Sequence, residues 1–227
     1  MYQTHDAHSI DLGIDLRAAN QSAADHNRDH FLAHQVYVLN LMSAPGAGKT
    51  TLLERTIDAL AGRWRMAVIE GDVQSRADAE RIEQRGVPVV QINTGGACHL
   101  DARLIHDHLG GFDLSALDLL VIENVGNLVC PAEFDLGEHD KVMLLSVTEG
   151  HDKPEKYPLM FHAARAMLLT KIDLLPHVDF DPDLAERRAR ALNRELEIFR
   201  LSARTGAGLD AWCRWLEARV LGVKGTH

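Results

Sequence analysis

Residues 36–62 have the sequence VYVLNLMSAPGAGKTTLLERTIDALAG, in which an apolar run is followed by a glycine-rich turn and an amphipathic stretch. Apolar residues in the amphipathic stretch recur at helical spacing, at Leu52, Leu53, Ile57 and Leu60. A strand, a glycine turn and a helix are the setting of a phosphate-binding loop, because glycine lets backbone N–H groups face phosphate oxygens and the helix N-terminus favours an anion. Ser43 stands where the first glycine of such a loop is usual, but Gly46 and Gly48 are present. The stretch therefore predicts a nucleotide site.

Each position of this loop has an expected role. Lys49 is expected to contact the β- and γ-phosphates, and Thr50 to offer its hydroxyl group to Mg²⁺. Gly46, Ala47, Gly48, Lys49, Thr50 and Thr51 are the candidate phosphate-binding residues. The alternative is a tight strand-to-helix turn in which the lysine is incidental.

Outward from this loop, short apolar runs alternate with helical patterns. The runs predict strands over residues 36–42, 66–70, 88–92, 117–123, 142–147, 166–170 and 196–203. Helices are expected between them, including one over residues 97–111 and one from about Leu209 to the end. Continuous apolar strands indicate a sheet covered on both faces. The fold class expected is α/β, a three-layer P-loop NTPase fold with a mostly parallel central sheet flanked by helices, over residues 34–227. Residues 1–33, which contain several histidines, are expected to form a helical or flexible extension.

Composition excludes several classes of protein. The chain has 227 residues and a net charge of −9, which argues against nucleic-acid binding because that function requires a basic surface. Its apolar runs are much shorter than the roughly 20 residues that span a bilayer, so no membrane association is expected. The N-terminus has no signal-peptide pattern, and the cytoplasm is the expected compartment. Three cysteines without an export signal argue against a disulfide framework.

Two carboxylates follow predicted strands. Asp72 ends the segment VIEGD and Glu123 ends LLVIE. Because the carboxyl ends of parallel strands meet beside the phosphate loop, both carboxylates are candidates to hold Mg²⁺ directly or through water. Lys49, Thr50, Asp72 and Glu123 form the expected catalytic set, and Gly126 is placed to let a switch loop move. The alternative is that both carboxylates only cap strands or helices.

The segment TKID over residues 170–173 supplies a candidate base-recognition pair. The Asp173 carboxylate can accept two N–H bonds from the guanine edge, and the Lys171 side chain can lie over the base. The segment resembles the Asn-Lys-x-Asp motif of GTPases, with Thr170 in the place of asparagine. Ser202 and Ala203, after the last predicted strand, are candidates to support the base through backbone N–H groups.

Adjacent Cys98 and His99, together with Cys130, form a candidate metal site. Thiolate and imidazole ligands suit borderline ions such as Ni²⁺ and Zn²⁺. The alternative for these residues is buried thiols and a histidine at a helix start. Cys213, between two tryptophans, is expected to be a core thiol, and His106 and His108 to lie on the polar face of a helix.

Seven segments occur in a characteristic order: SAPGAGKT, EGD, NTGGACHLDA, ENVGNLVCP, TEGHDKPEKYP, TKIDLLP and SARTGAGLDAW. Together they resemble the HypB-type nickel-incorporation GTPases of hydrogenase maturation, which belong to the dimerising SIMIBI class of P-loop GTPases. The resemblance extends over roughly residues 35–220. ACHLDA and ENVGNLVCP are its specific segments, whereas the nucleotide motifs are shared more widely.

The resemblance implies a GTPase that binds GTP, GDP and Mg²⁺ and carries nickel or zinc. Slow turnover is expected, because no residue in the sequence identifies itself as the group that positions the attacking water. The resemblance also implies that Cys98, His99 and Cys130 bind the metal, and that Lys153 reaches the nucleotide of a partner subunit. The implied partners are a second copy of the chain in a GTP-promoted homodimer, an accessory protein of the HypA type, and the precursor of the hydrogenase large subunit. Some family members begin with a cysteine-rich nickel site, but this chain has no cysteine before Cys98. Whether the N-terminal histidines bind metal stays open.

Three other functions remain as alternatives, one of which is a non-enzymatic metal buffer that uses the histidine-rich N-terminal arm. A urease-type nickel accessory GTPase carries a Cys-Pro-His metal motif, whereas here Cys98 and His99 are contiguous and Pro131-Ala132 follow Cys130. A P-loop kinase for a small molecule is disfavoured by Asp173.

Overall fold

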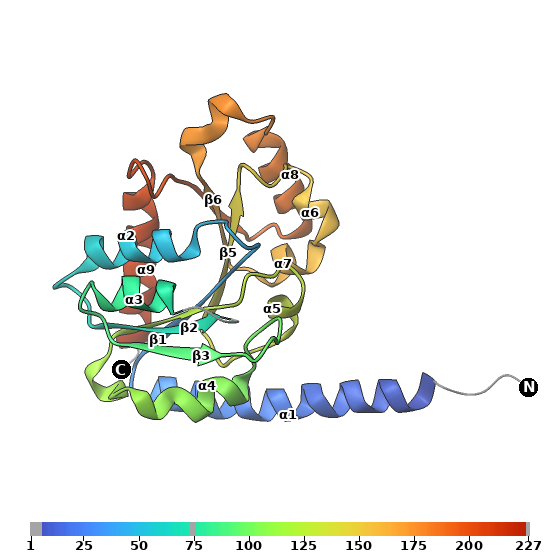
Figure 1. Ribbon diagram of the computed structural model, residues 1–227, viewed down its shortest axis with the longest axis vertical. Coiled ribbons are helices and arrows are strands. Elements are labelled where there is room, and N and C mark those ends of the chain that lie inside the picture. The colour runs from blue at the N-terminus through green and yellow to red at the C-terminus, as the bar shows by residue number, and fades with distance from the viewer. Residues whose placement is uncertain (1–5, 73–75, 226–227) are drawn as a thin grey trace, which may run out of the picture.

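Seven parallel strands form one sheet in the centre of the molecule (Figure 1). The computed structural model describes residues 6–72 and 76–225, with the side chains in these ranges except those of residues 6–16 and Asp72. The strands are β1 (Tyr37–Ser43), β2 (Met66–Asp72), β3 (Val89–Asn93), β4 (Leu119–Glu123), β5 (Asp140–Ser146), β6 (Ala166–Thr170) and β7 (Glu197–Arg200). Their order across the sheet is β3-β2-β4-β1-β5-β6-β7, with the phosphate-loop strand β1 in the middle.

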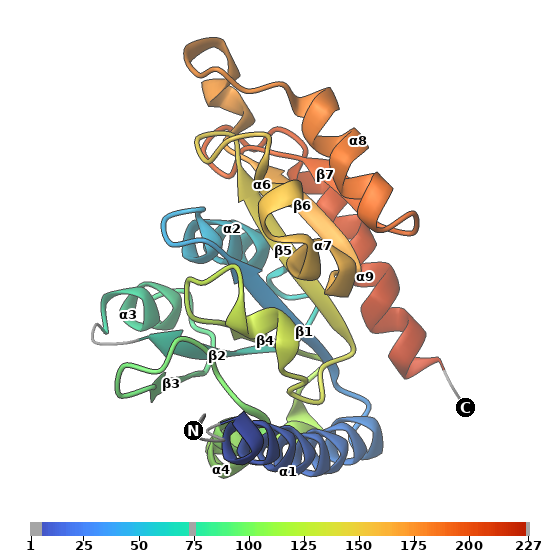
Figure 2. The ribbon, with the colours of Figure 1, turned by 90° about the vertical axis from the view of Figure 1, so that its right-hand side faces the viewer.

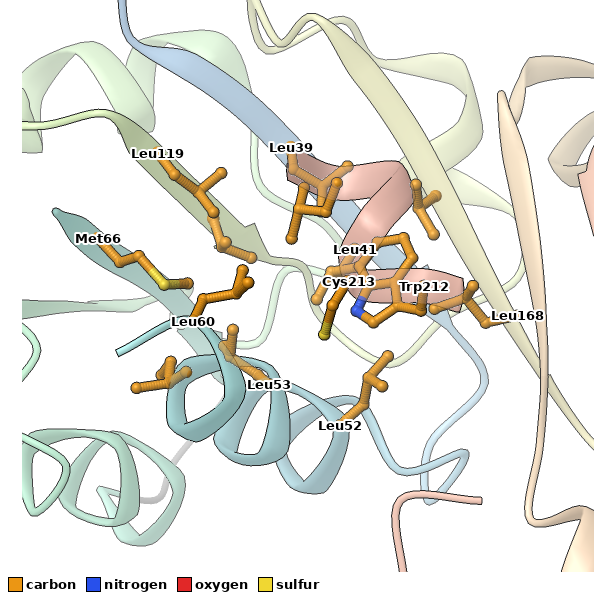
Figure 3. Packing of buried hydrophobic residues seen from close by; sticks show 14 of the residues in the cluster. Leu39, Leu41, Leu52, Leu53, Leu60, Met66, Leu119, Leu168, Trp212 and Cys213 are labelled. Carbon is orange, nitrogen blue, oxygen red and sulfur yellow. The ribbon is translucent and has the colours of Figure 1, made fainter. Parts of the chain in front are cut away.

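One face of the sheet is covered by α2 (Lys49–Leu60), α3 (Ala77–Glu83) and α9 (Leu209–Lys224). Leu39 and Leu41 of β1 point to this face, where they pack with Leu52 and Leu53 of α2 and with Trp212 of α9 (Figure 3). The indole N–H of Trp212 donates to the Thr56 hydroxyl over 2.9 Å, which satisfies a polar group inside this core. Cys213 is buried in the same cluster, which confirms the prediction of a core thiol.

The opposite face is covered by two groups of helices. Beside β3, β2 and β4 lie α1 (Asp6–Ala33) and α4 (Ala102–His108), side by side along one edge of the molecule (Figures 1 and 2). Beside β5, β6 and β7 lie α5 (Cys130–Glu133), α6 (Lys153–Lys156), α7 (Pro158–Ala163) and α8 (Pro182–Leu192). The described residues also form the short 3-10 helices η1 (Leu109–Gly111), η2 (Leu114–Ala116) and η3 (Ile172–His177).

This arrangement confirms the predicted fold class and the positions of the seven strands. The expected helix over residues 97–111 is wrong at its beginning, because α4 starts only at Ala102, where the Asp101 side chain accepts a hydrogen bond from the Leu104 N–H. Gly95 and Gly96 both have positive φ, so the chain before α4 is a turn. Among the described residues, no helix combines the length and the apolar character needed to cross a bilayer.

Helix α1 joins two loops that are distant in the sequence. The Asn20 side chain accepts from the Ala102 N–H and donates to the Asp135 carbonyl, over 2.9 and 2.8 Å. The buried Asn27 amide donates to the carbonyls of Ala102 and Leu136 over 2.8 and 3.0 Å. Because Ala102 follows Cys98 and His99 and residues 135–136 follow Cys130, α1 holds together the two segments that carry the predicted metal ligands. The division at residues 33 and 34 stays a prediction, and residues 1–5 lie outside the described part.

The substitution Asn27→Ala is expected to lower the free energy of unfolding by about 2 kcal/mol, since it removes two buried hydrogen bonds worth about 1 kcal/mol each. Urea unfolding followed by circular dichroism measures this change. Ser22→Ala on the exposed side of the same helix is the matched control and is expected to change the value by less than about 0.5 kcal/mol. Equal midpoints for the two variants would show that Asn27 does not anchor the helix.

Candidate functional site

The phosphate loop connects β1 to α2 at the carboxyl end of the sheet. Gly46 and Gly48 have φ values of 74° and 99°, a left-handed conformation that residues with a Cβ rarely adopt. Helix α2 begins directly after Gly48, so its first N–H groups face the loop. Residues of the predicted site that line one pocket here are Gly46, Gly48, Lys49, Thr50, Thr51, Glu123 and Lys171. The structure therefore brings the phosphate loop, the end of β4 and the base-recognition loop together.

Ser43, in place of the usual glycine, contributes to this pocket. It is fully buried at the end of β1, and its hydroxyl oxygen accepts a hydrogen bond from the Lys49 ammonium group over 3.1 Å. The same hydroxyl donates to the Ala44 carbonyl over 2.6 Å. Burial lowers the pKa of Lys49, whereas the neighbouring Glu123 carboxylate acts in the opposite direction. Ser43 thus holds the lysine in the loop.

Glu123 is a buried carboxyl group beside the phosphate loop. Its Oε1 accepts a hydrogen bond from the Thr50 hydroxyl over 2.8 Å, while its buried Oε2 has no hydrogen-bond partner among the side chains that the structure describes. Burial raises the pKa of Glu123 to about 7, and the Lys49 charge and the Thr50 hydrogen bond only partly oppose this effect. An unpartnered carboxylate oxygen next to a threonine hydroxyl group fits the oxygen ligands that Mg²⁺ prefers.

Two other predicted residues are placed less completely. The backbone of Asp72 ends β2, where it pairs with Asn93, but the Asp72 side chain lies outside the described part of the structure. Lys153 begins α6, with its ammonium group 5.2 Å from the centre of the Tyr157 ring. Their predicted roles at Mg²⁺ and at a partner's nucleotide stay predictions.

The predicted base-recognition residues line a second pocket beside the phosphate loop. It is formed by residues of three segments, among them Ala47, Lys171, Asp173, Ser202 and Ala203. Lys171 has a φ of 60° and donates from its ammonium group to the Gly46 carbonyl over 2.6 Å. Thr170, which replaces the usual asparagine, donates to the Ala47 carbonyl over 2.9 Å. The substituted threonine therefore still ties the base loop to the phosphate loop.

Cys98, His99 and Cys130 converge although Cys98 and Cys130 are 32 positions apart in the sequence. Their potential ligand atoms lie within 4.8 Å of one another. The sulfur atoms of Cys98 and Cys130 are 2.9 Å apart, and Cys98 Sγ lies 3.5 Å from His99 Nδ1. Tetrahedral binding with metal–sulfur bonds of about 2.3 Å places two sulfur atoms about 3.8 Å apart. The two thiols therefore need to move slightly away from each other to bind an ion.

The local environment affects the protonation of His99 and Cys130 and the access of an ion to the two thiols. Burial lowers the pKa of His99, whose ring stacks on Phe134 with a distance of 3.9 Å between ring centres, so the imidazole favours the neutral form that binds metals. The pKa of the Cys130 thiol is raised, mainly by the contact with Cys98 and secondly by burial. Cys98 is exposed and Cys130 is partly exposed, which leaves the pair accessible to an ion.

A short chain of hydrogen bonds connects the nucleotide pocket to the cysteine and histidine cluster. Asn124, next to Glu123, accepts from the Leu100 N–H over 3.2 Å, and Leu100 follows His99. Asn127 donates to the Cys98 carbonyl over 3.3 Å. Gly126 lies against the phosphate loop so closely that a Cβ would come within 3.0 Å of the Pro45 Cα. The loop from Glu123 to Cys130 therefore contacts both sites.

Sequence reasoning missed Asn124, Arg81 and Glu149. Asn124 is almost fully buried, and its amide donates to Asn40 in β1, which no local motif indicates. Arg81 of α3 lines the phosphate pocket and forms an ion pair with Glu54. Burial raises the pKa of Glu149, and its Oε1 accepts from the Ser146 N–H. The only signal for Glu149 was its place after a strand, in a segment noted for Lys153.

Fold and pocket together define a P-loop nucleotide-binding protein, with a central parallel sheet and a glycine loop between β1 and α2. A sequence model of the family described as CobW/HypB/UreG, nucleotide-binding domain, matches residues 37–200. The hydrogenase maturation factor HypB of Azotobacter vinelandii is 56% identical over 203 residues, which are 89% of this chain and 67% of that relative. The chain belongs to the CobW/HypB/UreG family.

Solved structures agree with the sequence comparison. HypB from Archaeoglobus fulgidus superposes with a TM-score of 0.85 at 38% identity, over 89% of this chain and 99% of that one. HypB from Helicobacter pylori, solved in complex with nickel, superposes with a TM-score of 0.84 at 39% identity, over 92% of this chain and 99% of that one. The predicted resemblance to the HypB-type branch is confirmed.

A pH dependence follows from Glu123 in the protein without nucleotide or metal. Its folded pKa of about 7 lies above the ordinary 4.5, so the folded state binds more protons than the unfolded state between these values. Stability from this group is therefore lost as pH rises from about 4.5 to about 7, by up to about 3 kcal/mol. Glu123→Gln keeps the shape of the side chain without its charge. The gain in free energy of unfolding of this variant over the wild type is therefore expected to be larger at pH 8 than at pH 5. Urea unfolding at both pH values measures the difference, and an equal gain at both would contradict the assignment.

Proposed function

We propose that the protein is a GTP-hydrolysing nickel metallochaperone for the maturation of [NiFe] hydrogenase. The observation that carries this proposal is the convergence of Cys98, His99 and Cys130 at the far end of the loop that begins at Glu123. Family membership supports it, as does the nickel complex of the Helicobacter pylori relative. Nickel is here the cargo, and zinc is a second ion that the same ligands accept.

Mg²⁺ is the expected companion of the nucleotide. Thr50 and Glu123 are the described residues that would hold it, since Glu123 has a buried oxygen without a hydrogen-bond partner in the described part of the chain, and Asp72 is the third candidate. When bound, the ion neutralises charge on the phosphate oxygens.

The residues of the chain supply positioning for hydrolysis. Backbone N–H groups at the start of α2 and the Lys49 ammonium group bind the phosphates, and Ser43 orients Lys49. Catalysis of this kind depends on placement of charge, so turnover is slow until a partner or a second subunit completes the site.

Recognition of guanine rests on Asp173. Its carboxylate lies in the pocket that Lys171, Ser202 and Ala203 also line. A carboxylate offers two acceptors for the two N–H donors of guanine, whereas adenine lacks this donor pair. A small-molecule kinase does not need to select guanine. Recognition of guanine by this pocket therefore favours a GTPase over the kinase alternative.

Coupling between nucleotide and cargo follows the loop from Glu123 to Cys130. A change at the γ-phosphate reaches Gly126, which lies against Pro45 of the phosphate loop. Asn124 and Asn127 transmit the change, because they hold the backbone on either side of His99 and Cys98. The nucleotide state thereby sets how tightly the ligands hold nickel.

The proposed partners follow from the family. GTP promotes a homodimer in which Lys153 reaches the partner's nucleotide, and nickel passes to the hydrogenase large-subunit precursor with a HypA-type protein in the cytoplasm. Val129, next to Cys130, is 49% exposed, and such an apolar side chain beside the metal ligands suits a contact surface. Relatives named hydrogenase maturation factors favour this cargo target over the urease-type alternative.

The central experiment is a Ni²⁺ titration with and without a non-hydrolysable GTP analogue, with the molecular mass followed by light scattering. We expect the analogue to produce a dimer and to change the nickel affinity by at least about fivefold, the usual lower limit of coupling between sites. Cys130→Ala is expected to lose tight nickel binding and keep GTP binding, while the buried-thiol control Cys213→Ala keeps both. Unchanged nickel stoichiometry in Cys130→Ala refutes the ligand assignment.

Asp173→Asn tests the choice of base. Asparagine replaces one acceptor by a donor, so GTP affinity is expected to fall about 100-fold through the loss of a charge-assisted hydrogen bond, and xanthosine triphosphate to bind better than GTP. Competition with a fluorescent nucleotide measures both affinities. The control Asp179→Asn changes an exposed aspartate nearby and is expected to leave GTP preferred. ATP binding equal to GTP binding in the wild type would favour the kinase alternative.

A further inference from the structure

Three histidines from two helices converge on the outer surface of the α1–α4 pair. His26 and His30 lie one turn apart on α1, and His106 lies on α4. The Nε2 atoms of His26 and His30 are 3.2 Å apart, and the potential ligand atoms of all three lie within 4.8 Å of one another. The ring centre of His106 is 4.9 Å from that of His26 and 6.0 Å from that of His30. The expectation that His106 only belongs to a polar helix face is therefore incomplete.

The packing of the two helices sets this convergence. Phe31 of α1 and Ile105 of α4 are both fully buried in one core cluster, and each lies next to a histidine of the group. Asn27, between His26 and His30, bonds the Ala102 carbonyl one turn before His106. The group is thus built on a rigid helix pair, which lowers the cost of ordering ligands around an ion.

Distances within the group match metal coordination. With metal–nitrogen bonds of about 2.0–2.1 Å in tetrahedral geometry, two nitrogens lie about 3.3 Å apart, close to the 3.2 Å between His26 and His30. Neither His26 nor His106 forms an ion pair in residues 17–71 and 76–225, so a salt bridge there does not explain the cluster. His26 and His106 are exposed and His30 is partly exposed, which allows an ion to enter.

A surface hollow adjoins the cluster. His30, His34, His106 and Asp107 line part of it. His34 lies one turn beyond His30, and its Nδ1 lies 2.8 Å from the His30 carbonyl. This contact uses Nδ1 and does not involve the second ring nitrogen, Nε2. The hollow gives room for water or a fourth ligand, the open position that a three-histidine site requires.

We propose that His26, His30 and His106 form a second metal site, which binds one Ni²⁺ or Zn²⁺ ion through neutral imidazoles. The site shares no residue with the Cys98–His99–Cys130 cluster. An ion bound there cross-links α1 to α4 and so stabilises the helix that holds together the two cargo-binding segments. The ligand class is a borderline divalent ion, because imidazole nitrogen suits Ni²⁺ and Zn²⁺ and binds Mg²⁺ poorly.

The test removes the thiol site first. The full-length chain, carrying Cys98→Ala and Cys130→Ala and no polyhistidine tag, is dialysed against buffered Zn²⁺ and, separately, Ni²⁺, without nucleotide, and bound metal is measured by elemental analysis. We expect one ion per chain to remain. Adding His106→Ala is expected to weaken binding by at least about tenfold, since loss of even an outer partner of a metal ligand has an effect of this size.

His108→Ala, on the same helix, is the matched control. Its Nδ1 lies 2.8 Å from the Leu104 carbonyl and it stands outside the cluster, so this variant is expected to retain the ion. Absence of bound metal in the cysteine-free chain overturns the proposal, and so does an equal loss in His106→Ala and His108→Ala. Amide hydrogen exchange gives a second measure, because Zn²⁺ is expected to slow exchange in α1 and α4 in the cysteine-free chain but not after His106→Ala. Since this chain lacks the thiol ligands, the result is independent of the cargo function proposed above.

Discussion

A carboxyl group buried at the end of β4 governs the arrangement of the site. Glu123 meets Thr50 of the phosphate loop on one side, and the next residue, Asn124, holds the backbone of Leu100 on the other. Burial makes the Glu123 charge unfavourable, as its pKa of about 7 shows, so a cation at this point stabilises the charged form. The same residue therefore contacts the phosphate loop and begins the loop that ends at Cys130.

Helix α1 has a structural role that its place before the domain does not suggest. Asn20 and Asn27 bond the backbone near both segments that carry the predicted metal ligands, and Phe31 enters the core beside β1 and β2. The extension is thus packed against the sheet in its described part. Because α1 touches α4, it also brings its histidines to His106, so one helix supports the thiol cluster and contributes to a second group of possible ligands.

Much of the fold was predictable because its signals are local. The strands β1, β4, β5 and β6 are buried on both faces almost throughout, and the glycine loop has a fixed spacing between β1 and α2. The beginning of α4 was not predictable from apolar spacing, since the Asp101 side chain caps the helix after a turn with two left-handed glycines. The sequence alone did not show what Thr170 does in the place of the usual asparagine. In the structure its hydroxyl group donates to a carbonyl of the phosphate loop, which lies far away in the sequence.

The sequence by itself determined the phosphate loop and the strand pattern and marked a candidate base-recognition pair, since each depends on residues close together in the chain. It also marked Cys98, His99 and Cys130 as possible ligands without showing that they meet. Only the tertiary structure decided that these three residues converge, that Asn124 joins the nucleotide and metal segments, and that His106 faces His26 and His30. The physical reason is that such meetings depend on the order of strands and the docking of α1, which are set by packing between distant segments.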